Sequence, residues 1–370
     1  MKKFEHMEQF KHEQLVYFYD ETTGLKGITC IHDTTLGPAL GGTRLWNYTT
    51  EEDAVLDVLR LGRGMTYKAA CAGLNLGGGK TVLKGDATKV KSEGYFRALG
   101  RYVQSLNGRY ITAEDVNTSC KDMNYLAMET DHVVGLAGKS GNPSPVTAWG
   151  AFMGIKASLK EVFGTDSLEG KTFAVQGAGQ TGYYLIKYLL GDYSDVQNWK
   201  NDKVYGEKAK KIYFTEINEA HIERMKKEHP EVEFVKPEDI YGLDVDVYAP
   251  CALGASVNDD TIPQLKCKII AGTANNVLKE AAHGDILKDK GILYSPDYVI
   301  NAGGLINVYH ELHGYQFGKA MNDVDLIYDR LLEIYGMAKK ENMAISKAAD
   351  LYGERRIETM KNVRATYIKR

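Results

Sequence analysis

The feature of this chain that most constrains its fold is a glycine pattern placed between a strand-like run and a helical pattern. Residues 172–176 (TFAVQ) have the composition of a buried strand, and residues 177–182 (GAGQTG) follow at once. Apolar residues then recur at helical spacing at Leu185, Ile186 and Leu189. Glycines in this setting permit a tight turn and bring a pyrophosphate close to a helix N-terminus. The pattern therefore predicts a dinucleotide-binding unit built on a parallel sheet.

A second strand-like run, residues 211–215 (KIYFT), ends at Glu216. A carboxylate in that place can accept hydrogen bonds from a ribose diol and repels a 2′-phosphate, so it indicates NAD rather than NADP. Glu216 follows the glycines at more than the usual interval of roughly 20 residues, because residues 191–210 read as a polar insertion. We assign no function to that insertion.

The N-terminal part of the chain contains two lysines among small residues, Lys68 in GMTYK (64–68) and Lys80 in LGGGK (76–80). Two ammonium groups held side by side repel each other. The repulsion favours one acting as a base near neutral pH while its neighbour stays charged and holds an anion. The alternative is two solvated surface lysines. A phosphate-binding P-loop would need glycine where the chain has Leu74.

Length, charge and cysteine content exclude several classes of protein. The 370 residues suffice for two domains with separate cores. A net charge of −3 offers no basic surface for nucleic acid or an anionic membrane, and the chain has neither a signal-peptide core nor a membrane-length apolar run. The five cysteines are scattered, which indicates neither a disulfide framework nor a metal site. We therefore expect a cytoplasmic protein with small-molecule partners, and neither nucleic acid nor a membrane as a partner.

Local patterns give a coarse order of elements before the glycine motif. Residues 15–19 and 25–32 read as strands joined by a turn, and a capping box at Thr50 predicts the start of a helix. Residues 110–112 read as a strand that runs into an acidic pair. Residues 138–145 are rich in Gly, Ser, Asn and Pro, and we place a domain boundary there.

Eight motifs stand in order along nearly the whole chain: GPALGGTR (37–44), GMTYK (64–68), LGGGK (76–80), AEDV (113–116), GNPSPVT (141–147), PCALGA (250–255), ANN (274–276) and NAGG (301–304). With the glycine motif, they resemble the amino acid dehydrogenases of the Glu/Leu/Phe/Val family, and most closely its leucine-specific members. Several motifs in the same order make the resemblance highly specific.

The resemblance implies an α/β fold of two domains, with the active site in the cleft between them. An N-terminal α/β domain with a mixed sheet would comprise residues 1–142 and a returning segment at about 338–370. It would bind the substrate, carry the catalytic residues and form the contacts of a homo-oligomer. A Rossmann-type domain of residues 143–337 would bind NAD.

The resemblance also implies a reaction, the reversible oxidative deamination of branched-chain L-amino acids to 2-oxo acids, ammonia and NADH. L-leucine would be preferred, with isoleucine and valine also accepted. Lys68 would hold the substrate α-carboxylate, and Lys80 would activate water against the imine carbon. Asp115 would take a proton from the substrate ammonium and orient Lys80. From the residues alone, a helix cap is an alternative role for Asp115.

The substrate side chain would lie against apolar residues. Glutamate-specific relatives have a lysine and a serine where this chain has Leu40 and Val308, and phenylalanine enzymes tend to have glycine at Ala113. Phenylalanine or valine dehydrogenase activity is the alternative within the family, and a catalytically silent NAD or amino acid sensor is the alternative outside it. The predicted substrate-binding residues are Leu40, Gly41, Gly42, Met65, Lys68, Ala113 and Val308.

The cofactor would lie along the second domain. The resemblance implies that Thr147 contacts the nicotinamide amide, that the glycine loop holds the pyrophosphate and that Glu216 holds the ribose. Asn275 or Asn276 would contact nicotinamide or substrate, although both are also typical turn residues, and Cys251 has packing as its alternative role. The predicted cofactor-binding residues are Thr147, Gly177, Ala178, Gly179, Gln180, Thr181, Gly182, Glu216, Cys251, Ala252, Asn275 and Asn276.

Overall fold

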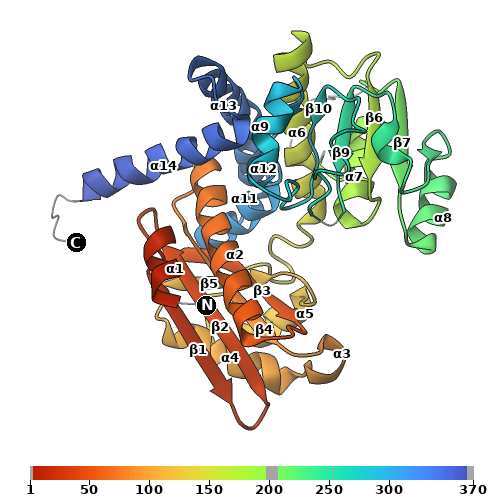
Figure 1. The fold of residues 1–370 in the computed structure, drawn as a ribbon. Helices are drawn as coiled ribbons and strands as arrows, with labels where there is room; N and C mark the ends of the chain where they lie inside the picture. Colours follow the sequence, from red (N-terminus) through yellow and green to blue (C-terminus); the bar gives the residue numbers. More distant parts are fainter. Residues whose placement is uncertain (1–2, 197–206, 253, 365–370) are drawn as a thin grey trace. The chain divides into compact units, whose positions relative to one another are not determined.

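The computed structural model describes residues 3–196, 207–252 and 254–364, and these form two compact units (Figure 1). Each unit has its own sheet and its own apolar core. The first unit contains the described residues of Met1–Asn142, Val308–Tyr315 and Gly353–Arg370. The second contains those of Pro143–Asn307 and Gln316–Tyr352.

The sheet of the first unit has five strands: β1 (Gln14–Asp20), β2 (Leu25–Asp33), β3 (Ala39–Trp46), β4 (Gly77–Lys84) and β5 (Tyr110–Glu114). Their order is β1-β2-β4-β3-β5. The pairs β1–β2 and β2–β4 are antiparallel, whereas β3 is parallel to both β4 and β5. The predicted mixed sheet is therefore confirmed, and the β1–β2 hairpin contains the two predicted strands.

The helical elements of the first unit are α1 (Lys3–Phe10), α2 (Glu51–Cys71), α3 (Ala87–Val90), α4 (Glu93–Ser105), α5 (Cys120–Leu126), η3 (His310–His313) and the end of α14 (Ile345–Arg364). The predicted capping box starts α2, because the Thr50 hydroxyl accepts the Asp53 N–H at 3.1 Å. Val82 of β4 packs in the core under α2, and its neighbour Leu83 packs in the core under α4. The two helices therefore cover opposite faces of the sheet.

Glycines in β3 and β4 allow two close backbone approaches, of α2 to the sheet and of β3 to β4. A Cβ on Gly78 would stand 2.1 Å from the backbone nitrogen of Thr66 in α2. A Cβ on Gly41 would stand 1.8 Å from the carbonyl oxygen of Gly79. Since no side chain fits in either place, the close approach of α2 requires glycine at position 78, and the close approach of β3 to β4 requires it at position 41.

The second unit contains six parallel strands in the order β11-β10-β9-β6-β7-β8. They are β6 (Thr172–Gln176), β7 (Lys211–Thr215), β8 (Glu233–Phe234), β9 (Val247–Pro250), β10 (Ile269–Ile270) and β11 (Leu293–Tyr294). Read from β8, this is the strand order 3-2-1-4-5-6 of dinucleotide-binding sheets. The predicted Rossmann-type unit is therefore confirmed, and its order reverses between β6 and β9.

The helical elements of the second unit are α6 (Ser144–Phe163), α7 (Gln180–Leu189), α8 (Glu219–Glu228), η2 (Ile240–Gly242), α9 (His283–Asp289), α10 (Asp297–Ile300), α11 (Gly303–Tyr309), α12 (Phe317–Asp325) and α13 (Ile327–Lys340). The last residues of α11 cluster with the first unit, and α14 crosses the division at Gly353. Residues 197–206 of the predicted insertion lie outside the described residues. Among the described helices, none is long and apolar enough to cross a membrane.

Two glycine substitutions, one in α2 and one in β4 against α2, should change the stability of the protein in opposite directions. Gly64 lies in α2 with nothing within 4 Å of an added Cβ, so Gly64→Ala should stabilise the protein by about 0.5–1 kcal/mol. Gly78→Ala should destabilise it by about 1–3 kcal/mol, because backbone atoms of α2 block the methyl group. Thermal unfolding of both variants and of the unmodified protein measures this difference. A Gly78→Ala variant that melts no lower than the unmodified protein would contradict the packing of α2 on β4.

Candidate active site

An ion pair between Lys80 and Asp115 lies in the first unit. Lys80 is on β4 and Asp115 directly follows β5, and the two strands flank β3. The Lys80 Nζ is 2.8 Å from the Asp115 Oδ2, with the two side chains 7% and 24% exposed. A nearly buried ammonium needs such a partner, since an unpaired charge is strongly disfavoured away from water. The structure thus brings together two residues that the sequence analysis placed in one site.

Three residues that the sequence analysis did not place in the site extend this pair. Arg44 of β3 donates its Nε hydrogen to the same Asp115 Oδ2 at 3.1 Å. Its terminal nitrogen donates to Asp57 of α2 at 3.1 Å, and the Tyr48 hydroxyl donates to the same Asp57 oxygen at 2.5 Å. Arg44 stands in the GPALGGTR motif, which was a signal for it. Asp57 and Tyr48 lie in no motif.

The charges of this cluster stabilise one another. Burial alone would raise the pKa of Asp115, but Lys80 and Arg44 outweigh it and lower that pKa to about 2. Burial opposes the charge of Arg44, yet Asp115 and Asp57 raise its pKa above the ordinary value. Burial and the neighbouring Asp57 also raise the pKa of Tyr48, so its hydroxyl remains a donor. Asp115 is therefore ionised at neutral pH, between two cations.

The turn after β5 is tied to β3, and this fixes Asp115. The Asp115 N–H donates to the Thr118 hydroxyl at 2.9 Å, and that hydroxyl donates to the Thr43 carbonyl at 2.9 Å. Asn117 has a φ of 60°, a left-handed conformation that asparagine tolerates, and its side chain donates to the Leu45 carbonyl at 3.0 Å. The carboxylate is thus positioned by backbone and side-chain contacts to the central strand.

Among the residues predicted for the substrate pocket, Gly42 lies against the Asp115 side chain, and Gly41 lies against Met65 of α2. Gly42 of β3 pairs with Ala113 of β5, and a Cβ on Gly42 would stand 2.9 Å from the Asp115 Cβ. A Cβ on Gly41 would stand 3.3 Å from the Met65 Cγ, which places α2 over the same strand. Lys68 lies one helical turn beyond Met65 and is half-buried.

Leu40 is buried on β3, and Val308 is buried near the end of α11 in the segment that clusters with the first unit. The carboxylate of Glu311 in that segment accepts the backbone N–H groups of Gly135 and Ser140, each at 3.1 Å. These bonds join residues 308–315 to the first unit. The predicted pairing of Leu40 with Val308 stays a prediction.

In the second unit, the glycine motif forms an open turn between β6 and α7. Gly177 has a φ of 95°, which favours glycine, and a Cβ on Gly182 would stand 2.0 Å from the Gly177 carbonyl oxygen. The first residue of α7 is Gln180, and its N-cap residue Gly179 forms no side-chain cap. The N-terminus of α7 therefore has no side-chain acceptor from its N-cap residue, which suits a pyrophosphate.

Glu216 is hydrogen-bonded to this turn. Its Oε2 accepts the Ala178 N–H at 3.0 Å, and its Oε1 accepts the N–H groups of Ile217 and Asn218 at 2.8 and 3.1 Å. Burial raises the pKa of Glu216, but the three backbone donors outweigh burial and lower it overall. An ionised carboxylate thus stands directly beside the glycine turn.

The end of β9 lies against the glycine turn from the other side. The Cys251 N–H donates to the Gln176 carbonyl at 2.7 Å, and a Cβ on Gly177 would stand 2.9 Å from the Ala252 Cβ. Burial raises the pKa of Cys251 to about 11, so its thiol is protonated at neutral pH and suits packing rather than nucleophilic attack. The hydroxyls of Thr181 and Thr273 are hydrogen-bonded at 2.7 Å.

Asn301, which the sequence analysis did not place in the site, holds the segment that contains Asn275. Its side-chain amide donates to the Asn275 Oδ1 at 2.8 Å and to the Thr273 carbonyl at 3.2 Å. Asn276 has a φ of 53°, and its carbonyl accepts the Ala255 N–H at 2.7 Å. The NAGG motif was the signal for Asn301.

Thr147 in the first turn of α6 faces Gly304 of α11, because a Cβ on Gly304 would stand 2.6 Å from the Thr147 hydroxyl oxygen. The Thr147 N–H donates to the Pro143 carbonyl at 2.8 Å. Both residues lie in the second unit, the unit that also contains the glycine turn.

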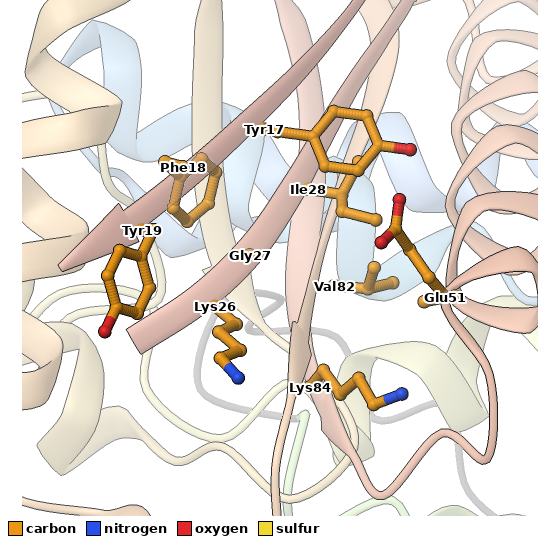
Figure 2. A pocket seen from close by; sticks show the side chains of 10 residues that line it. Tyr17, Phe18, Tyr19, Lys26, Gly27, Ile28, Glu51, Val82 and Lys84 are labelled. Carbon is orange, nitrogen blue, oxygen red and sulfur yellow. The ribbon is translucent and has the colours of Figure 1, made fainter. Parts of the chain in front are cut away.

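A separate groove of about 500 Å³ lies on the first unit. Tyr17, Ile28 and Val82 come from three neighbouring strands, and Glu51 comes from the start of α2 (Figure 2). Val82 and Lys80 are two residues apart and therefore lie on the same face of β4, but neither Lys80 nor Asp115 lines the groove.

Among the described residues, no group of three or more His, Cys, Asp or Glu side chains could hold a metal ion.

The chain matches two related protein families over most of its length. Residues 12–132 match the family described as Glu/Leu/Phe/Val dehydrogenase, dimerisation domain. Residues 138–362 match the family described as Glutamate/Leucine/Phenylalanine/Valine dehydrogenase.

Curated relatives and a solved structure match the whole chain. Leucine dehydrogenase from Bacillus cereus is 54% identical, over 99% of this chain and 96% of its own length. Leucine dehydrogenase from Thermoactinomyces intermedius is also 54% identical, over 100% of this chain and 97% of its own length. The crystal structure of L-tryptophan dehydrogenase from Nostoc punctiforme is 43% identical with a TM-score of 0.81, and covers 97% of this chain and 99% of its own.

The ionised Asp115 should make stability depend on pH in acid. Its folded pKa of about 2 lies below the ordinary value of 3.8, so its contribution is complete well above pH 3.8 and is lost as the pH falls through about 2. Urea unfolding of the unmodified protein and of Asp115→Asn, each at about pH 5 and about pH 3, measures this. The free energy of unfolding of the unmodified protein, taken relative to that of Asp115→Asn, should be about 1 kcal/mol lower at pH 3 than at pH 5. An unchanged difference would contradict an ionised, paired Asp115.

Proposed function

This chain belongs to the Glu/Leu/Phe/Val dehydrogenase family, and on that premise we propose the reaction that it catalyses. The chain is an enzyme that uses a nicotinamide cofactor. It carries out the reversible oxidative deamination of branched-chain L-amino acids, with L-leucine preferred and isoleucine and valine also accepted, to 2-oxo acids and ammonia. The identity of 51–54% with several leucine dehydrogenases along the whole chain supports this assignment.

The ion pair of Lys80 and Asp115 is the structural observation that carries the proposed chemistry. Lys68 holds the α-carboxylate of the amino acid as a point charge, and Lys80 acts on the water that attacks the imine carbon. The chemistry that a nicotinamide cofactor would supply when bound is a hydride acceptor for the substrate Cα. With its pKa lowered to about 2, Asp115 is a weak proton acceptor in the ligand-free protein, so orienting Lys80 is its main proposed role. Proton transfer from the substrate ammonium to Asp115 stays a prediction.

The second unit is the proposed cofactor-binding unit, and NAD is the proposed cofactor. The glycine turn and the N-terminus of α7 would hold the pyrophosphate, because there is open space beside Gly179 and its position at the N-cap supplies no side-chain acceptor. Glu216 would accept hydrogen bonds from the ribose hydroxyls, and its charge would repel the 2′-phosphate of NADP. Thr147 and either Asn275 or Asn276 would contact the nicotinamide end.

The first unit is the proposed site of the amino acid and of the contacts in a homo-oligomer. Its match to a family described as a dimerisation domain supports the second assignment. The side-chain pocket would be formed by Leu40, Ala113 and Val308, all of which are buried and apolar. A catalytically silent sensor of the same fold is disfavoured, because the buried Lys80–Asp115 pair has a cost in folding that a sensor does not need.

Substrate selection tests the proposed function. Formation of NADH, followed by absorbance at alkaline pH, should be fastest with leucine, with isoleucine and valine also reacting. Phenylalanine should be weaker in kcat/KM by roughly 10- to 200-fold, because a methyl group at Ala113 narrows the pocket. Glutamate should be rejected, because an apolar pocket does not compensate for desolvation of its second carboxylate.

The outcomes of that test are distinct. Phenylalanine ahead of leucine would contradict the proposed pocket, and appreciable glutamate turnover would contradict the placement of Leu40 and Val308. Absence of turnover with every amino acid would favour the sensor.

Cofactor selection tests the role of Glu216. The unmodified protein should use NAD far better than NADP, and Glu216→Ser should narrow that difference by removing the charge. The measurement is kcat/KM for both cofactors at saturating L-leucine. As a matched control, Glu219→Ser removes a carboxylate at the start of α8 and should leave the ratio unchanged. Equal kcat/KM for NAD and NADP in the unmodified protein would show that Glu216 does not reach the ribose.

A further inference from the structure

We propose that Arg44 and Asp57 are positioning residues for the deamination reaction, and that Tyr48 completes their network. The inference rests on the proposed function. A continuous series of hydrogen bonds runs from Tyr48 through Asp57 and Arg44 to Asp115, and Asp115 in turn holds the Nζ of Lys80. None of the three added residues contacts Lys80 in this series. They act on it through the carboxylate of Asp115.

The geometry of Arg44 is the first argument. Its Nε and one terminal nitrogen donate in different directions, to Asp115 at 3.1 Å and to Asp57 at 3.1 Å. A guanidinium is planar and rigid, so fixing one of these contacts also fixes the direction of the other. A lysine has one ammonium at the end of a flexible chain and does not reproduce this fork.

The origin of the residues is the second argument. Arg44 belongs to β3, Asp57 to α2, Asp115 to the turn after β5 and Lys80 to β4. The network therefore ties the orientation of Lys80 to the packing of α2 on the sheet. A displacement of roughly 1 Å at a reacting group lowers a rate by about a hundredfold, so a second anchor for Asp115 has a direct consequence for turnover.

The balance of charge is the third argument. Lys80 and Arg44 are cations, Asp115 and Asp57 are anions, and they alternate along the network. All four side chains are less than a third exposed. A change that removes one charge or one contact leaves its neighbour without a full set of partners, and that neighbour then moves or admits water.

Conservative substitutions test the proposal in the whole protein. Arg44→Lys keeps the charge but not the fork, Asp57→Asn keeps the shape but not the charge, and Tyr48→Phe removes one hydroxyl. The expected loss in kcat with L-leucine is about a hundredfold or more for Arg44→Lys, about tenfold or more for Asp57→Asn, and less for Tyr48→Phe. KM for L-leucine should change little, because Lys68 is proposed to hold the α-carboxylate.

A matched control comes from the same unit. Arg97 of α4 also bridges two carboxylates, Glu129 at 2.6 Å and Glu93 at 3.3 Å, and these contacts do not include Asp115 or Lys80. Arg97→Lys should keep kcat within about twofold of the unmodified protein. Near-ultraviolet circular dichroism and thermal unfolding of each variant report the folded fraction of the whole chain, so that a loss of folded protein is not counted as a loss of kcat.

Chemical rescue distinguishes positioning from general loss of structure. In Arg44→Ala, added ethylguanidine should restore part of kcat, whereas ethylamine should not, because only the guanidinium reproduces the fork. Rescue of Lys80→Ala by ethylguanidine is not expected. Should Arg44→Ala fail to fold, Asp57→Asn and Tyr48→Phe decide the question with the same readouts.

The outcomes separate this proposal from the proposed function. An unmodified protein that forms no NADH from L-leucine overturns both. An active unmodified protein whose Arg44→Lys and Asp57→Asn variants stay within about threefold in kcat overturns the positioning role alone. A fall in kcat matched by an equal loss of the near-ultraviolet circular dichroism signal also overturns it, since the residues would then be needed only for folding.

Discussion

A lysine ammonium withdrawn from water is stable only beside an acceptor of opposite charge, and the first unit is organised around that requirement. Lys80 is 7% exposed, and its carboxylate partner comes from a strand two positions away in the sheet. The pair spans β3, which lies between β4 and β5. Arg44, which β3 itself supplies, then completes the charge balance around Asp115. One ion pair thus joins residues that the strand order of this sheet brings together.

In the second unit, strand pairing explains why Glu216 lies beside the glycine turn although the two are far apart in the sequence. Counted along the chain, Glu216 lies unusually far from the glycines, which made its role doubtful from spacing alone. In the sheet, Gln176 of β6 pairs with Thr215 of β7, so Glu216 emerges beside the turn whatever the length of the connection. Its bond to the Ala178 N–H follows from that register. Strand pairing, rather than the count of residues, sets the distance.

Local signals predicted a large part of this fold, and the limits of that prediction have a physical cause. The β1–β2 hairpin, the start of α2 and the β6–α7 turn were all readable, because each depends on neighbouring residues. The central strands β3 and β4 were not, because glycine is depleted in strands and is present here to admit α2.

The candidate site shows the same limit. Lys80 and Asp115 could be found from motifs, but Asp57 and Tyr48 could not. Their contacts to each other and to Arg44 join a helix, a loop and a strand, and no sequence period reports such an arrangement.

The central strand β3 also shows how substrate selectivity can vary while the catalytic residues are kept. Leu40, Gly42 and Arg44 are two residues apart and so share one face of β3; Leu40 pairs with both β4 and β5, and Arg44 pairs with β4. A substitution at Leu40 would therefore alter the wall of the proposed pocket while the strand that carries Arg44 stays paired with β4.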